Sequence, residues 1–198
     1  MNLQLREQPP EFVRQYGAVP IAFEVRERLA VELIANGIGG VRLNRCAVEA
    51  PYTKDYDAIP GQRPEEWPAQ WDLVHWCLCA AFRDDEHIGG VAVVLDTRQM
   101  SGSRSDVGEA VIWDIRVRPD QRNLGVGRKL LAFAEDRARS AGKLRVSVET
   151  QNNNVAACQF YAGAGFALRS FDRLAYPTLP DEVQLIWSKP LNGQASAR

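Results

Sequence analysis

The residues best suited to chemistry lie in a short turn, Gln121-Arg122-Asn123-Leu124-Gly125-Val126-Gly127, directly before a helical pattern. The first amides of a helix lack partners and carry partial positive charge, so they can hold a phosphate. Because Gly125 and Gly127 have no Cβ, a pyrophosphate can approach this backbone closely, and Arg122 and Arg128 can add charge-assisted contacts. The turn therefore predicts a phosphate site, and the alternative is a tight strand-to-helix connection without a ligand.

The elements on either side of the turn are predicted from their periodicity. Apolar residues at every second position from Val111 to Val117 predict a half-buried strand, which Pro119 ends. Apolar residues at helical spacing follow the turn, and Gly142 marks the end of that helix. A second alternating strand begins at Leu144. Residues 109–151 thus predict a strand, a glycine turn, a helix and a strand.

Two other phosphate-binding motifs do not fit this turn. A dinucleotide fingerprint needs a third glycine where Leu130 stands, and a P-loop needs a Gly-Lys-Ser/Thr run, which the sequence lacks.

A more specific resemblance comes from two motifs in the same order and at the same separation as in a known family. Arg122-x-x-Gly125-x-Gly127, after a strand ending Asp114-Ile115-Arg116-Val117, resembles the coenzyme A motif of the GNAT superfamily of acyl-CoA-dependent N-acetyltransferases. Asn154-x-x-Ala157-x-x-Phe160-Tyr161-x-x-x-Gly165-Phe166 resembles the helix and strand that follow in that superfamily. The resemblance implies an α+β (α/β) GNAT fold, with a mixed, mostly antiparallel sheet that is splayed at the acetyl-CoA site and flanked by helices.

Within that superfamily, the chain looks most like streptothricin acetyltransferases. The similar segments are 113–117, 148–152, 156–161 and 176–183, with a weaker echo at Pro51-Tyr52-Thr53-Lys54 and Tyr56-Asp57. Those enzymes acetylate an amine on the β-lysine arm of a cationic antibiotic. The resemblance implies the same reaction here, by direct attack of the amine on the thioester.

The resemblance also implies where acetyl-CoA, the co-substrate, would bind. The pantetheine arm would bond to the backbone of residues 115–117, the pyrophosphate would sit on the amides of residues 123–128, and Asn154 would hold the arm from the other side. The expected acetyl-CoA-binding residues are Ile115, Arg116, Val117, Arg122, Asn123, Leu124, Gly125, Val126, Gly127, Arg128 and Asn154.

Transfer to an amine needs a proton acceptor, because a primary ammonium with a pKa of about 10.4 is almost fully charged at neutral pH. A carboxylate can take that proton through water and can attract the cation beforehand. Asp114 and Glu149 are the candidates, since each lies near the end of a strand beside the expected splay. Alternation places both opposite the apolar residues of their strands, although a solvated strand face would look the same.

The later steps need an oxyanion stabiliser and an acid. The amide of Val117 could stabilise the tetrahedral oxyanion. Tyr161 stands where the superfamily places the general acid that protonates the leaving thiolate; the alternative is an aromatic side chain packed in the core. On the last loop, Tyr176, Asp181 and Glu182 are expected to bind the cationic acceptor, since two carboxylates beside an aromatic ring suit an ammonium.

Composition restricts the partners. A net charge of −1 and a pI near 6.2 argue against nucleic acid or an anionic membrane. The sequence has no apolar run near the roughly 20 residues that cross a bilayer and no signal pattern at its start, so a cytoplasmic protein is expected. Four scattered cysteines and two histidines assemble no metal site. Cys77, Cys79 and Cys158 are expected to pack in the core.

The 198 residues fit one domain, with residues 1–18 and 192–198 as loosely ordered ends. Ile21, Phe23 and Val25 begin a strand whose continuation over 26–34 fits either a strand or a short helix, and a second strand follows over 41–48. Residues 51–68 are expected to be an aromatic loop, either on the surface or covering the substrate.

The remaining elements follow from the same patterns. We expect an antiparallel hairpin of residues 73–82 and 87–95, a helix over 153–164, and strands over 166–173 and 182–188.

Three functions stay open from the sequence alone. The first is acetylation of a cationic antibiotic, and the second is acetylation of a protein N-terminus, a lysine or a metabolic amine. The third is a non-catalytic acyl-CoA-binding regulatory module, which the intact Tyr161 and Asp114 disfavour. A homodimer is also left open.

Overall fold

A computed structural model describes residues 2–99 and 108–191. The chain divides into two compact units. Unit 1 comprises the described residues within Met1–Ala22, Asp55–Val148 and Ser188–Arg198. Unit 2 comprises Phe23–Lys54 and Glu149–Trp187.

The sheet of unit 1 is mostly antiparallel. Its strands follow the order β1-β4-β5-β6-β7, and only the β6–β7 pair is parallel. The bounds are β1 Leu3–Gln8, β4 Trp76–Arg83, β5 Glu86–Val94, β6 Glu109–Val117 and β7 Arg145–Gln151, the last three residues of β7 belonging to unit 2. The β6–β7 ladder ends at Ile112 and Val148, although β6 continues for five more residues. The resemblance to the GNAT superfamily implies a splay between these two strands.

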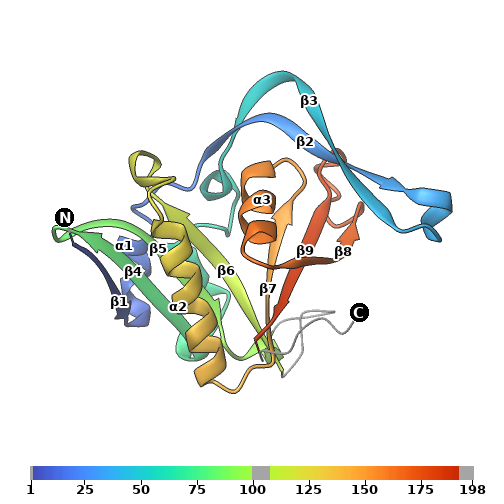
Figure 1. Cartoon of the computed structure of the whole chain (residues 1–198). Helices are drawn as coiled ribbons and strands as arrows, with labels where there is room; N and C mark the ends of the chain where they lie inside the picture. The colour runs from blue at the N-terminus through green and yellow to red at the C-terminus, as the bar shows by residue number, and fades with distance from the viewer. Residues whose placement is uncertain (1, 100–107, 192–198) are drawn as a thin grey trace. The chain divides into compact units, whose positions relative to one another are not determined.

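Different layers cover the two faces of this sheet. Helix α2, Val126–Ser140, lies along β4, β5 and β6 (Figure 1). Leu130, Leu131 and Ala134 are among its buried residues. Because side chains alternate along a strand, the opposite face carries Trp76, Leu78 and their neighbours. They form a core with α1, Val13–Tyr16, and with the 3₁₀ helices Pro64–Ala69 and Leu73–His75.

A ring cluster forms the centre of that second core. Trp67 lies 5.7 Å from both Tyr16 and Trp76, and Trp113 lies 5.2 Å from Trp76, measured between ring centroids. Tilted and edge-on ring pairs at these distances add stability beyond the area they bury.

Unit 2 contains a long two-stranded ribbon and a small helix. Strands β2, Phe23–Leu33, and β3, Val41–Lys54, pair antiparallel across a turn (Figure 1). The other elements are α3, Val155–Gly163, β8, Ala167–Asp172, and β9, Gln184–Pro190, with the strand order β7-β9-β8. The β9 residues from Ser188 onward belong to unit 1.

Buried Asn152 ties the ribbon to its own unit. Its carbonyl accepts from the Leu29 amide at 2.8 Å, and its side-chain amide donates to the Leu29 carbonyl at 3.0 Å. Its side-chain oxygen accepts from the Val183 amide at 2.9 Å.

The structure corrects two expectations for the first third of the chain and decides a third that was left open. The loosely ordered lead-in over residues 1–18 is wrong, because β1 pairs with β4 and Tyr16 is fully buried. Of the two alternatives left open for residues 26–34, the strand is confirmed, since β2 continues to Leu33 before a short 3₁₀ turn. Residues 51–54, expected in a loop, extend β3. Residues 192–198, the other expected loose end, lie outside the described residues.

Candidate active site

The glycine turn leads directly into the N-terminus of α2. Asn123 and Gly125 have φ values of 62° and 81°, and α2 begins directly afterwards at Val126. An added Cβ on Gly125 would meet nothing within 4 Å, so the turn is open. The first turn of α2 contains no acidic residue, so no carboxylate there repels an anion.

Arg122 is held by backbone rather than exposed to a ligand. Its Nε donates to the Val117 carbonyl at 2.9 Å, and one terminal nitrogen donates to the Ala22 carbonyl at 3.1 Å. Burial lowers the pKa of its guanidinium. In this structure the side chain fixes the end of β6 against the following turn, and its predicted contact with a phosphate stays a prediction.

Asp114 belongs to a buried group of four residues, Tyr16, Asp57, Asp114 and Arg116, which we call the ionic cluster. Arg116 donates to Asp114 through Nε at 2.9 Å and a terminal nitrogen at 2.8 Å. It also bonds both oxygens of Asp57, at 3.0 and 3.1 Å. The Tyr16 hydroxyl donates to Asp114 Oδ1 at 2.6 Å. Two carboxylates thus share one guanidinium, which leaves one net negative charge.

Burial and the charges of neighbouring side chains together set the charge states of Arg116 and Tyr16 in the ionic cluster. The side chains of Arg116 and Asp114 are 1% and 9% exposed, and that of Asp57 is 19% exposed. Burial opposes the charge on Arg116, but neighbouring Asp114 outweighs it and raises the guanidinium pKa. Burial, and then the charge of Asp114, raise the pKa of Tyr16 well above its usual value. Tyr16 is therefore a neutral donor beside a charged arginine.

A β-bulge explains why Asp114 faces this cluster. In the β5–β6 ladder, Ala92 lies opposite Asp114, and the next residue, Val93, lies opposite Ile112. The ladder skips Trp113, which is therefore the extra residue of the bulge. The bulge keeps Trp113 in the ring cluster and also turns Asp114 toward Tyr16, on the same face. The expectation that Asp114 lies opposite the apolar residues of its strand is therefore wrong. Bulges recur beside active sites because they redirect a side chain.

In unit 2, Glu149 is the acceptor of a second polar group. Its Oε1 accepts from the Tyr176 hydroxyl at 2.5 Å, and its Oε2 accepts from the Gln184 amide at 2.8 Å. Gln151 donates to the Tyr176 hydroxyl at 2.8 Å. The structure therefore brings together two predicted site residues, Glu149 and Tyr176.

Tyr161 and Asn154 lie on and before α3. Tyr161 is 2% exposed, and its ring lies 5.1 Å from that of Phe160 and 5.4 Å from that of Phe166. The Asn154 side chain accepts from the Ala157 amide at 3.1 Å and so caps the helix. Its predicted contact with the pantetheine arm stays a prediction.

The two carboxylates of the last loop differ in their surroundings. Glu182 bonds Lys54 at 2.6 Å, with each side chain 11% exposed, so its charge is already matched. The Asp181 side chain is 91% exposed and lies 3.7 Å from Arg28. Of the two, only Asp181 is open to solvent.

Sequence reasoning missed Tyr16, Asp57 and Lys54. The last two had a signal, because both lie in the weaker echo at residues 51–57. Tyr16 had none, since it lies in a polar segment with no periodicity.

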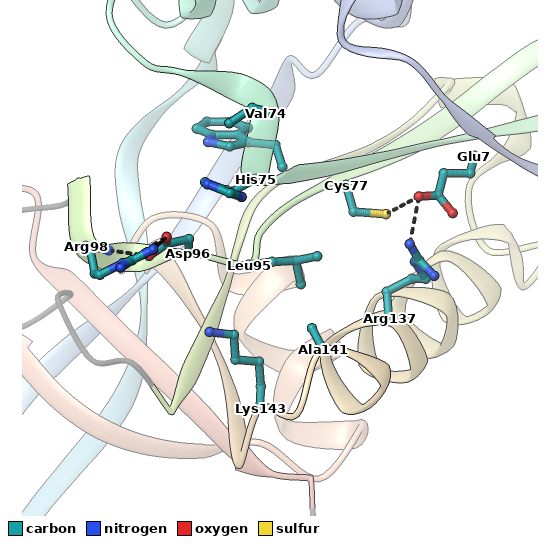
Figure 2. Close-up of a pocket in the computed structure, with 11 residues that line it drawn as sticks. Glu7, Val74, His75, Cys77, Leu95, Asp96, Arg98, Arg137, Ala141 and Lys143 are labelled. Carbon is teal, nitrogen blue, oxygen red and sulfur yellow. Dashed lines mark hydrogen bonds and ion pairs between the residues drawn. The ribbon is translucent and has the colours of Figure 1, made fainter.

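A pocket in unit 1 includes none of the predicted site residues (Figure 2). Figure 2 shows Glu7 between Cys77 and Arg137, with Glu7 Oε1 accepting from the Cys77 thiol at 3.6 Å and from Arg137 at 2.9 Å. Asp96 and Arg98, which line the other side of the pocket in Figure 2, pair with each other. Burial raises the pKa of Cys77 to about 11, so this thiol stays protonated and supplies no nucleophile.

Cys79 and Cys158 are buried, as expected for core cysteines. Over residues 2–99 and 108–191, three or more metal-ligating side chains do not gather anywhere. Over the same ranges, each helix is too short or too polar to cross a membrane.

The parallel pair of the mixed sheet, β6 and β7, is joined through a glycine turn and α2, as the resemblance to acyl-CoA-dependent acetyltransferases implies. Residues 45–166 match the Acetyltransferase (GNAT) family. The chain is also 33% identical over 168 residues to streptothricin acetyltransferase of Escherichia coli, covering 83% of each protein. The chain belongs to the GNAT family and is an acetyltransferase.

Solved structures agree with this assignment. The crystal structure of nourseothricin acetyltransferase matches with a TM-score of 0.74 and 25% identity, over 97% of this chain and 100% of that one. An acetyltransferase of Bacillus anthracis str. Ames, solved in complex with acetyl coenzyme A, matches with a TM-score of 0.75 and 26% identity, over 96% and 99%. The GNAT fold predicted from the sequence is confirmed.

Proposed function

We propose that this acetyltransferase transfers the acetyl group of acetyl-CoA to a primary amine of a cationic small molecule, the β-lysine amine of streptothricin. The observation that carries the proposal is the 33% identity to streptothricin acetyltransferase of Escherichia coli over 83% of both chains. The net negative charge of the ionic cluster supports it, because a buried carboxylate pair with one guanidinium attracts a cation.

Acetyl-CoA would bind through the glycine turn. The amides from Asn123 to Arg128 would hold the pyrophosphate, and the backbone of Ile115, Arg116 and Val117 would bond the pantetheine arm. The open space above Gly125 and the absence of acid in the first turn of α2 support this placement.

The two predicted carboxylates would have different tasks. Asp114 already accepts three hydrogen bonds, two of them from Arg116, so its oxygens are committed. We assign it the task of attracting and orienting the ammonium. Glu149 would accept the proton, through water, so that the neutral amine can attack the thioester carbon.

Val117 and Tyr161 would act on the intermediate. The Val117 amide would donate to the oxyanion that forms when the amine adds to the thioester. The hydroxyl of Tyr161 would protonate the sulfur as the carbon–sulfur bond breaks. Tyr176 and Asp181 would contact the cationic acceptor, whereas Glu182 would act through its pair with Lys54.

A second acceptor class, a protein N-terminus, a lysine or a metabolic amine, uses the same chemistry. A thiol-release assay with acetyl-CoA against streptothricin, aminoglycosides, polyamines and peptides separates the classes. We expect the highest kcat/KM with streptothricin. A higher value with a peptide would contradict the proposed acceptor while leaving the acetyltransferase assignment intact.

A further inference from the structure

We propose that Tyr16 is a positioning residue for Asp114 in the acetyl transfer, an inference that rests on the proposed function. It acts through its hydroxyl, which donates to Asp114 Oδ1 at 2.6 Å and lies 3.3 Å from the Asp114 carbonyl oxygen. Tyr16 comes from the N-terminal segment, almost one hundred residues before Asp114 in the chain.

The direction of this hydrogen bond is fixed by charge. Tyr16 is fully buried, and burial together with Asp114 keeps its hydroxyl protonated at neutral pH. The Arg116 guanidinium lies over the Tyr16 ring, 5.2 Å from its centroid. A neutral phenol cannot replace the charge of Arg116, but it adds a second donor to the oxygen that Arg116 Nε already binds. The carboxylate is thereby held in one orientation from two sides.

The sheet leaves room for this ring. A Cβ on Gly90 would lie 2.5 Å from Cε2 of Tyr16 and 2.8 Å from the Cys79 carbonyl, closer than real atoms approach. Gly90 pairs with Arg116 in the β5–β6 register, on the face that also carries Asp114. The tyrosine ring therefore occupies the place of a β5 side chain, which aims its hydroxyl at the carboxylate.

The bulge at Trp113 in β6 also directs Asp114 toward Tyr16. Without the extra residue, Asp114 would face away from Tyr16, because alternate side chains leave a strand on opposite faces. A glycine in β5, a bulge in β6 and a buried tyrosine thus converge on one carboxylate oxygen.

The test is a double-mutant cycle with Tyr16→Phe and Asp114→Asn, assayed by thiol release with the best acceptor of the amine panel. If Tyr16 acts through Asp114, Tyr16→Phe should lower turnover by about 10-fold to 100-fold, the range for a hydrogen bond to a charged group. The same change in the Asp114→Asn background should cost less than about 3-fold, because the two effects are coupled. Binding of acetyl-CoA, measured by calorimetry, should stay unchanged.

Val13→Ala is the matched control, since Val13 is buried on the same helix and belongs to the same core. It should lower the thermal midpoint but leave turnover per folded molecule unchanged. Additive losses in the cycle, or equal losses in Tyr16→Phe and Val13→Ala, would overturn the positioning role. A wild-type enzyme that acetylates no amine would instead overturn the proposed function, and this inference with it.

Discussion

The ionic cluster predicts a large loss of stability in the substitution Arg116→Met. Methionine fills much of the same space but removes the guanidinium that both Asp57 and Asp114 bind. Breaking a buried ion pair by removing one partner costs about 3–5 kcal/mol, because the remaining charge is buried without compensation. Asp57 is 19% exposed, so water can reach it, and the lower end of that range, about 3 kcal/mol, applies.

This cost can be read as a shift in thermal midpoint. For a chain of this length each 1 kcal/mol corresponds to roughly 2–4 °C, so Arg116→Met should melt about 6–12 °C below the wild type. Calorimetry or circular dichroism measures the shift. Arg118→Met is the matched control, because Arg118 lies two residues further along the chain and also binds two carboxylates. Its partners Glu86 and Asp120 are 64% and 58% exposed, so water can replace the guanidinium.

The control should therefore melt close to the wild type. If Arg116→Met loses less than about 1 kcal/mol, the carboxylates are not buried around Arg116 as described, and the reasoning fails. Equal losses in the two variants would refute it in the same way, because burial would then not be the deciding factor.

Three further outcomes follow. Gly125→Ala should weaken acetyl-CoA binding in calorimetry, since the left-handed conformation of this residue costs alanine about 1–2 kcal/mol and strains the turn. Gly142→Ala introduces the same strain at the other end of α2 and should keep the affinity. Tyr161→Phe should lower turnover by roughly 10²–10⁴-fold with acetyl-CoA affinity kept; a stable variant with full turnover would remove the acid role. A thiol reagent at pH 8 should label Cys46, the one exposed cysteine, and reach the other three only after denaturation; rapid labelling of a second thiol in the native protein would contradict the burial.

The central part of the fold could be predicted because its signals are local. Alternation predicts β6, and helical spacing predicts α2. Gly125, directly before α2, and Gly142, after its end, have φ values of 81° and 71°, which glycine adopts readily. These features lie within a few residues of one another, so no distant contact has to be known.

The candidate site was only partly predictable because its geometry depends on distant contacts. A one-residue bulge at Trp113 changes which face Asp114 occupies, and an alternating sequence does not record it. Tyr16 looks like part of a polar lead-in, yet its ring packs over Gly90 of β5, where a Cβ would leave no room for it. Lys54 and Glu182 neutralise each other across 128 residues. The candidate residues could be predicted from their types and positions, but their hydrogen-bond partners depend on the tertiary structure.

The most direct test of the proposed function is a competition experiment. The purified enzyme receives acetyl-CoA and an equimolar mixture of streptothricin, an aminoglycoside and a peptide with a free N-terminus, and mass spectrometry with NMR locates the acetyl group. The proposal predicts that the acetyl group appears on the β-lysine amine of streptothricin. Acetyl transfer to the peptide or the aminoglycoside, with streptothricin unmodified, would contradict it.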